Sequence, residues 1–349
     1  MTRTLLLLTV LLAAAFALRA ACGSRASAPP ELALERLVRA VEASDKTVAA
    51  VSVEVPGRGV RWLFARSKGR WRAREAFGAF LDERAFQAWF ADVLDARGVR
   101  IAEVGARAAV YGFTEGATLR LALHGPRVLD APDADVMVAF ELARGGDGRV
   151  FARRPGEQAL LELDRDLLAP LGALEPGALP PLVDRHLLAA SLDAEATGFR
   201  SVSIEHVGRA PLVLTRMDAA VGQDAHWKLA HDGREDEALA WRAGGFTSLC
   251  LRGEALGFGP SSDAKALGLD APLVKLVLTP DHGEPIELAL GERTASGEAW
   301  VWNRKTNLVL RIDGRMHAEL APEARAFLDP DGGTPWERWL QNLGPTERR

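Results

Sequence analysis

The chain presents one order of landmarks twice, and this repeat restricts its fold more than any other feature. In the first copy, strand-like segments joined by turns lead to Trp71, and in the second copy the same order leads to Trp227. The segment Tyr-Gly-Phe at 111–113 follows Trp71 by 40 residues, and Leu-Gly-Leu at 267–269 follows Trp227 by the same 40. Alternating strand-like segments come after both landmarks. We therefore predict one structural unit used twice.

The composition agrees with a globular chain of that kind. A length of 349 residues leaves room for about two domains. With 48% hydrophobic and 26% charged residues, the chain is not a disordered segment, a collagen-like fibre or a multi-span membrane protein. We predict an α+β fold with two tandem related domains, each a mainly antiparallel β-sheet flanked by helices. The predicted segments are a leader at 1–22, a linker and helix at 23–46, a first repeat at 47–175, a linker at 176–200, a second repeat at 201–330, and a C-terminal helix and tail at 331–349.

Apolar spacing predicts where the helices lie. Asp82 is a candidate N-cap, and apolar residues recur after it at helical spacing, at positions 86, 89, 90 and 93. A weaker helix is predicted over 236–242, before two consecutive glycines, and an opening helix over 31–43. The proline-rich stretch 169–181 is predicted to be a linker.

The first 22 residues have the pattern of an export signal. Arg3 is followed by an uncharged run over 5–18, which is shorter than the roughly 20 residues that a transmembrane helix needs. Small residues then precede Cys22, and this pattern resembles a bacterial lipoprotein signal, in which the cysteine becomes the lipidated first residue. Arg19 stands where that signal usually has leucine. We expect lipidation at Cys22; a cleaved soluble form and an uncleaved anchor are the alternatives.

The landmarks and their spacing resemble DUF4340, a bacterial family of unknown function, over about residues 47–330. The segment Leu-Val-Asp-Arg-His-Leu-Leu at 182–188 is similar to the one that leads into the second copy in that family. The first copy departs from the pattern at Phe113, where leucine is usual, and lacks a glycine like Gly291. The resemblance implies an envelope protein with an N-terminal membrane segment or lipoprotein signal, sometimes encoded with ABC transporter components. It implies no catalytic residues.

A basic cluster is the most distinctive local feature. Seven basic residues and no acid occur within the 17 positions 58–74. Strand alternation would put Arg70, Arg72 and Arg74 on one face and Trp71 on the other. The candidate surface for an anionic partner consists of Arg66, Lys68, Arg70, Arg72 and Arg74. Its partner would be lipid head groups or an acidic protein surface. The alternative is a solvated sheet face whose arginines pair with carboxylates from elsewhere.

Aromatic residues supply two further candidate surfaces. Trp300 and Trp302 share one face of a predicted strand and form a candidate aromatic platform. Trp336 and Trp339 lie on one face of a predicted C-terminal helix and form a candidate docking stripe for a partner or a membrane interface. Packing of that stripe on the second domain is the alternative. Cys250 is interpreted as a small buried apolar residue.

The sequence contains no hydrolase elbow, phosphate loop or zinc-protease helix, so we predict no cofactor and no metal site. The net charge of −4 gives no basic excess for nucleic acid. We expect a non-enzymatic, membrane-anchored protein on the periplasmic side of the cell envelope. It would be a binding or scaffold module accessory to an ABC-transporter-like membrane complex or a surface complex. The alternative is a periplasmic hydrolase or a sugar-binding protein that uses the cleft between the two repeats.

Overall fold

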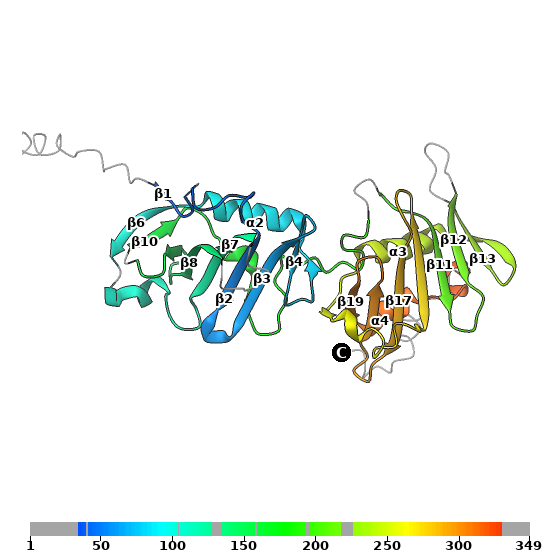
Figure 1. Cartoon of the computed structure of the whole chain (residues 1–349). Helices are drawn as coiled ribbons and strands as arrows, with labels where there is room; N and C mark the ends of the chain where they lie inside the picture. The colour runs from blue at the N-terminus through cyan, green and yellow to red at the C-terminus, as the bar shows by residue number, and fades with distance from the viewer. Residues whose placement is uncertain are drawn as a thin grey trace, which may run out of the picture.

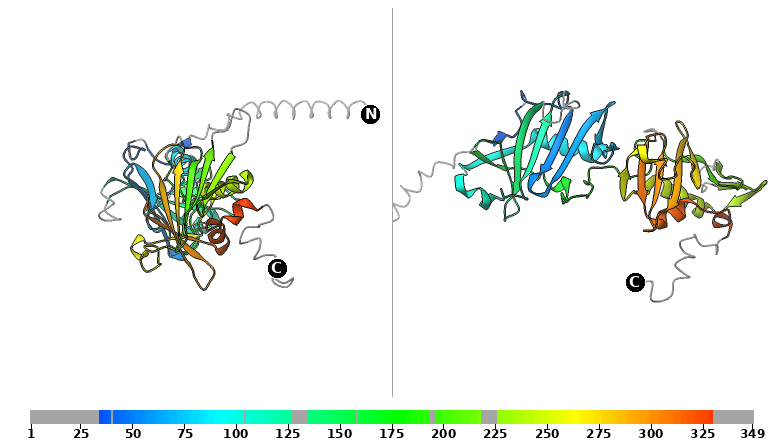
Figure 2. Two further views of the ribbon diagram at one scale, coloured as in Figure 1. Left: turned by 90° about the vertical axis from the view of Figure 1, so that its right-hand side faces the viewer. Right: turned by 60° about the horizontal axis from the view of Figure 1, so that its bottom comes forward.

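The described part of the chain forms two antiparallel sheets with few helices. The computed structural model describes residues 34–39, 41–103, 105–126, 135–157, 159–192, 196–217 and 226–329. The two sheets lie next to each other, and one long helix runs along each of them (Figure 1). The right-hand view of Figure 2 shows the same two bodies side by side. The predicted α+β class with two mainly antiparallel sheets is confirmed at this level.

The first sheet has ten strands in the order β1-β6-β10-β9-β8-β7-β2-β3-β4-β5. Their bounds are β1 Leu34–Arg36, β2 Ala50–Val55, β3 Val60–Ser67, β4 Arg70–Ala73, β5 Ala79–Phe80, β6 Arg97–Glu103, β7 Leu119–His124, β8 Val136–Arg144, β9 Val150–Arg153 and β10 Ala159–Leu163. Among the described residues of this domain, 3-10 segments accompany these strands at η1 Pro56–Arg58, η2 Gly105–Tyr111 and η4 Ala169–Leu171. One face of this sheet is covered by α2 Glu83–Asp95.

The second sheet has nine strands in the order β14-β13-β12-β11-β16-β17-β18-β19-β15. Their bounds are β11 Phe199–His206, β12 Leu212–Met217, β13 His226–His231, β14 Arg234–Ala238, β15 Gly257–Gly259, β16 Val274–Pro280, β17 Ile286–Arg293, β18 Ala299–Asn303 and β19 Leu308–Ile312. The helical elements are α3 Ala240–Arg252, η5 Ser261–Asp263, α4 Gly314–Leu320 and α5 Arg325–Leu328.

Both sheets connect their strands in one and the same order. When the order is read from β5 in the first sheet and from β14 in the second, the strands of the two sheets correspond one to one. Among the described strands, only β1 has no counterpart. The long helices α2 and α3 each follow the strand at which that reading starts. The landmark tryptophans also correspond, since Trp71 lies in β4 and Trp227 in β13, and both are buried.

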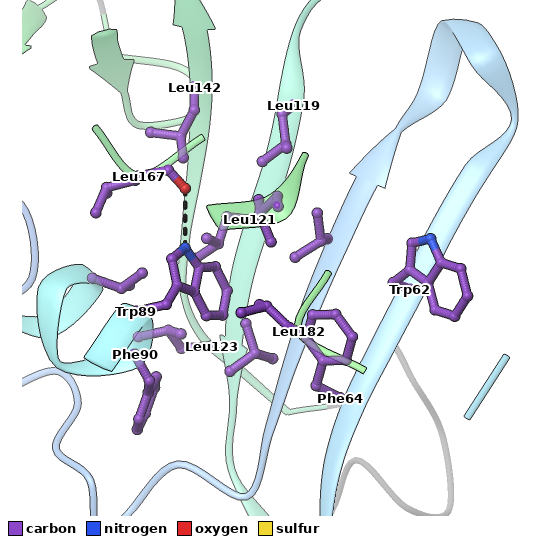
Figure 3. Packing of buried hydrophobic residues seen from close by; sticks show 14 of the residues in the cluster. Trp62, Phe64, Trp89, Phe90, Leu119, Leu121, Leu123, Leu142, Leu167 and Leu182 are labelled. Atoms are coloured by element: carbon purple, nitrogen blue, oxygen red, sulfur yellow. Dashed lines mark hydrogen bonds between the residues drawn. The ribbon is translucent and has the colours of Figure 1, made fainter. Parts of the chain in front are cut away.

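The first core is built around α2, as its apolar spacing predicts. Asp82 caps the helix because its carboxylate accepts the N–H of Ala85 at 2.9 Å. The buried residues of the helix are Phe86, Trp89, Phe90 and Val93. Trp89 donates its indole N–H to the carbonyl of Leu167 at 3.0 Å, which satisfies a buried polar group (Figure 3). The predicted helix after Asp82 is confirmed.

Two other helix predictions are wrong. The stretch predicted as an opening helix contains β1, which pairs with β6, and Leu34 and Val41 of its apolar stripe are exposed. Pairing with a neighbouring strand satisfies the backbone there, and so overrides the helical spacing. In the second copy, the predicted segment 236–242 begins in β14, and α3 runs on through Gly244 and Gly245. Packing of its buried face holds this helix despite the glycines.

The stretch 169–181 is not a free linker either. Leu171 and Leu174 are buried in the first core together with Leu182. Prolines there mark irregular backbone, but the side chains still pack. The predicted linker 176–200 likewise contains a segment hydrogen-bonded to both domains, and β11 begins before it ends.

Candidate functional site

The segment 182–188 joins the two domains as an extended strap. On one side it pairs with the end of β5, and on the other with the chain just before β15. Four backbone hydrogen bonds join the strap to its neighbours on the two sides. They run from Asp82 N–H to Leu182 O (2.9 Å), Asp184 N–H to Phe80 O (2.9 Å), Ala255 N–H to Arg185 O (2.7 Å) and Leu187 N–H to Gly253 O (3.0 Å). Because both edges are hydrogen-bonded, the strap restricts the motion of one domain against the other.

Phe80, a residue of the first domain, also connects the two domains. It lies on β5, yet its side chain is buried in the hydrophobic core of the second domain. The guanidinium of Arg72 lies 4.0 Å from the centre of the Phe80 ring and that of Arg70 lies 5.8 Å from it. Arg70 also donates to the carbonyl of Ala190 at 3.3 Å, across the junction. Burial, together with the nearby charge of Arg70, lowers the pKa of Arg72.

The five residues of the predicted basic surface therefore fall into two groups. Arg70 and Arg72 belong to the domain junction, whereas Arg66, Lys68 and Arg74 are exposed. Within the described residues, none of these three forms an ion pair. Arg66 stands opposite Trp71 in the β3–β4 ladder, and so it shares a face with the core and not with Arg72. The five residues do not make one continuous basic face.

A groove with a cavity of about 500 Å³ opens between the two domains beside the strap. Its apolar walls come from both sides: Trp62, Phe77 and Leu179 from the first domain, and Leu256, Phe258 and Trp300 from the second. Trp62 is buried, and Phe258 packs against both hydrophobic cores. Pockets at domain interfaces lined by aromatic residues are frequent binding sites.

Two large apolar side chains stand exposed at this groove, one from each domain. Phe77 is 53% exposed and Leu256 is 45% exposed. Phe77 also has a φ of 53°, a left-handed conformation that is unfavourable for a bulky residue. Residues in such conformations persist where the surrounding structure holds them there, and they are frequent at functional sites.

Three of the four charged side chains that line the groove have structural partners. Arg61 pairs with Glu54 at 2.9 Å, and Arg311 pairs with Glu298 at 3.4 Å. Glu75 accepts the backbone N–H of Leu63 at 2.7 Å. These groups hold the groove walls in place.

The predicted aromatic platform is half-buried and not an open surface. Trp300 and Trp302 do share one face of β18, where they pack against the cluster of Ala264, Leu269 and Val309. Trp302 donates its indole N–H to Asn307 at 3.1 Å. Trp300 alone reaches the groove. The 3-10 turn η5 and the residues after it cover the rest of this face, which sequence alternation cannot foresee.

The remaining sequence candidates fall in two groups. Cys22, Trp336 and Trp339 lie outside the described residues. Cys250 is fully buried, and burial raises the pKa of its thiol to about 12, so its interpretation as an inert apolar residue is confirmed. No helix in the described ranges is long and apolar enough to cross a bilayer.

One polar pair escaped the sequence analysis. Ser52 on β2 and His124 on β7 are hydrogen-bonded at 2.8 Å, although 72 residues separate them. The contact resembles the nucleophile and base of a hydrolase. Both residues are buried, at 5% and 2% exposure, so a substrate cannot reach the serine in this arrangement. The pair acts as a cross-strand hydrogen bond. Only the strand pairing of β2 with β7 reveals it.

Comparison with known proteins adds no relative: no family model, no curated protein and no solved structure matches this chain. The resemblance to DUF4340 stays a prediction.

Proposed function

We propose that this chain is a non-enzymatic binding module of the cell envelope, which holds a segment of a protein partner in the groove between its two domains. The observation that carries the proposal is the meeting of exposed Phe77 and exposed Leu256, from different domains, at one aromatic-walled cavity. Binding energy at protein interfaces concentrates in such apolar and aromatic positions around a pocket.

Rigidity of the groove supports the proposal. The strap at 182–188 is hydrogen-bonded to both domains, and Phe80 reaches from one domain into the other core. Walls that are fixed before binding reduce the entropy lost when a partner is held. The structural engagement of Arg61, Glu75 and Arg311 supports a binding role over a catalytic one, because these groups stabilise the walls.

We also propose that the two domains are copies of one ancestral unit. The common strand order supports this, and so do the two glycine landmarks. Gly112 and Gly268 both adopt a positive φ, of 86° and 71°. The residue after each glycine donates its N–H five residues back: Phe113 to Ala108 at 3.2 Å, and Leu269 to Ala264 at 2.8 Å.

Export and lipidation at Cys22 complete the proposal. A lipid anchor there would hold the module on the periplasmic side of the envelope, beside an ABC-transporter-like or surface complex that supplies the partner. Incorporation of labelled palmitate into the wild-type chain and into a Cys22→Ser variant tests this part. We expect label in the wild type alone. A wild-type chain without label would contradict the anchor.

Co-purification from detergent-solubilised envelope membranes tests the groove. The groove variant is Phe77→Ser with Leu256→Ser. The matched control is Val110→Ser with Val207→Ser, which removes one exposed apolar side chain from each domain away from the groove. We expect one protein partner to accompany the wild type and the control, and to be lost from the groove variant. Equal retention by both variants would contradict the proposal.

A sugar-binding role is the second candidate. The groove offers two indole rings, of Trp62 and Trp300, and two carboxylates, of Glu75 and Glu175. Aromatic rings beside polar groups suit a saccharide. Binding of the same wild-type and groove-variant chains to an array of bacterial glycans distinguishes the two candidates. A glycan bound by the wild type and released by Trp300→Ala would favour the sugar.

A further inference from the structure

The long helices α2 and α3 correspond to each other position by position. Each has 13 residues, and each buries its fourth, seventh, eighth and eleventh residue. These buried residues are Phe86, Trp89, Phe90 and Val93 in α2, and Ala243, Phe246, Thr247 and Cys250 in α3. Because the same positions of both helices are buried, the remaining positions can be compared directly.

Three of these remaining positions differ in chemistry between the two helices. The second, sixth and tenth residues are Arg84, Ala88 and Asp92 in α2, and Trp241, Gly245 and Leu249 in α3. All three are exposed in α2, where Asp92 pairs with Arg165 at 2.6 Å. In α3, Trp241 is 58% exposed and Leu249 is half-buried. Since residues four apart lie on one face of a helix, α3 has an apolar stripe where α2 has a polar one.

A cleft of about 230 Å³ lies along this apolar stripe, between α3, α4 and α5. Its apolar lining consists of Trp241, Phe246, Leu249, Pro322, Ala326 and Phe327. Gly245 also borders the cleft, and a Cβ added there would meet no atom within 4 Å, so space is open beside the helix backbone. The charged groups have partners: Arg315 pairs with Glu319 at 3.0 Å, and the guanidinium of Arg242 lies 4.1 Å from the centre of the Trp241 ring. We call this site the α3 cleft.

We propose that the α3 cleft binds the chain's own C-terminal segment 334–344. The sequence of this segment predicts a helix, and its large apolar residues Trp336, Trp339, Leu340 and Leu343 occupy positions i, i+3, i+4 and i+7. Such a helix cannot bury its apolar face by itself, and the docking of that face into an apolar groove is a recurring mode of recognition. The indole rings of the segment would fill the space that Gly245 leaves open.

The place where the described chain ends supports this occupant. Ala326 and Phe327 of α5 line the cleft, and Asp329 is the last described residue. Trp336 follows Asp329 by seven residues, and an extended chain of that length spans at most about 25 Å. The segment is therefore tethered beside the cleft, and a short tether gives an effective concentration on the order of millimolar. This tether favours the segment over an occupant that must come from solution.

Photo-crosslinking within the purified full chain tests the site. A photoreactive phenylalanine analogue replaces Trp241 in one chain and Arg84, at the same position of α2, in another. We expect an intrachain adduct between position 241 and the segment 334–344, and no such adduct from position 84. Trp336→Ser with Trp339→Ser should reduce the adduct at least tenfold. The matched control, Arg338→Ser with Gln341→Ser, changes the opposite side of the predicted helix and should leave the adduct unchanged.

Three results of this experiment would overturn the proposal. The first is the absence of an adduct between position 241 and the segment. The second is an equal adduct from position 84, which would show that the segment does not select α3. The third is an adduct that joins two copies of the chain, which would identify a second copy as the occupant.

Hydrogen exchange supplies an independent measurement, in which the change is in the cleft and the signal comes from the segment. Trp241→Arg introduces the residue type that α2 has at this position. Val207→Arg is the control, because it adds the same charge at another exposed apolar residue of the second domain. We expect the amides of 336–344 to exchange at least tenfold faster in Trp241→Arg than in the wild type and the control. Equal exchange in the three chains would overturn the proposal. Neither experiment involves a partner or lipidation, so a failure leaves the groove and the anchor untouched.

Discussion

The hairpin connection between β4 and β5 and the one between β13 and β14 occupy the same place in the two domains. Each ends in a left-handed pair, Phe77-Gly78 in the first domain and Asp232-Gly233 in the second. Aspartate tolerates this conformation, because its short side chain bonds locally, whereas phenylalanine does not. The second domain therefore has the turn that favours stability, and the first has a strained aromatic residue facing the groove.

For the long helices the comparison is reversed, because the first domain has the helix that is better stabilised by its own residues. Helix α2 has a side-chain N-cap and a packed aromatic face. Helix α3 has no side-chain cap and two glycines in its middle. It is supported from outside, since Phe246 packs on Phe327 of α5 at 5.6 Å between ring centres. The domains thus share an order of strands, but each has its own way of covering its sheet.

Among the variants that test this comparison of the two domains, the removal of Trp89 is expected to change the unfolding free energy most. Trp89→Ala deletes a fully buried indole and should cost the first domain about 3–5 kcal/mol of unfolding free energy. Phe246→Ala should cost the second domain less, because Phe246 borders a surface cavity of about 230 Å³. Hydrogen exchange followed peptide by peptide separates the two domains. An equal loss of protection in both domains after Trp89→Ala would show that they do not have separate cores.

The exchange of the turn residues at positions 77 and 232 has the next largest expected effect. Phe77→Asp should stabilise the first domain by about 0.5–1 kcal/mol, because it removes the left-handed strain, and it should abolish partner binding. The reciprocal Asp232→Phe should destabilise the second domain by a similar amount and leave binding intact. Urea unfolding and the co-purification assay measure the two effects. If Phe77→Asp lowered stability, Phe77 would be a packing residue and not a strained one.

Exchanging glycine and alanine in the helices has a comparable or smaller effect. A Cβ added at Gly244 meets no neighbouring atom, so Gly244→Ala should stabilise α3 by about 0.5–1 kcal/mol. The exposed Ala88 of α2 is the matched position, and Ala88→Gly should lose about as much. Thermal unfolding of both variants checks this. A Gly244→Ala variant that melts at a lower temperature would mean that the glycine pair serves another purpose.

The smallest effect concerns pH. Burial lowers the pKa of His317 below its ordinary 6.5, and the charge of Arg293 adds to this. His317 donates from Nε2 to the carbonyl of Gly291 at 2.9 Å and accepts at Nδ1 from Arg293 at 3.3 Å. The unfolded chain therefore binds a proton that the folded chain does not, and stability falls as pH drops below about 6.5.

The first domain lacks this group, because Leu168 stands at the same offset from Asp164 that His317 has from Asp313. Urea unfolding at about pH 7.5 and about pH 5.5 should show a smaller pH effect in His317→Gln than in the wild type. An equal pH effect in both chains would place the titrating group elsewhere.

Local signals predicted part of this fold. The cap at Asp82 and the apolar spacing after it gave α2, and the tryptophan and glycine landmarks gave the repeated order. The short strand β1 was missed because its three residues carry no alternation, and its pairing with β6 is not local. Helix α3 was misplaced because Gly244 and Gly245 argue against a helix that tertiary packing maintains.

The groove could not be found from sequence. Phe77 and Leu256 lie 179 residues apart in the chain and meet only because the strap joins β5 to the chain before β15. The basic cluster at 58–74 drew attention to charge, but Arg70 and Arg72 serve the junction. The number of charged residues in a stretch of sequence does not reveal which of them have ion-pair partners in the fold.

Photo-crosslinking from the groove in living cells tests the central claim most directly. A photoreactive phenylalanine analogue replaces Phe77 in one chain and Val110, exposed and outside the groove, in another. We predict an adduct at position 77 that maps to one segment of one envelope protein, and no such adduct at position 110. The same adducts at both positions, or no protein adduct at position 77, would contradict the groove as the binding site.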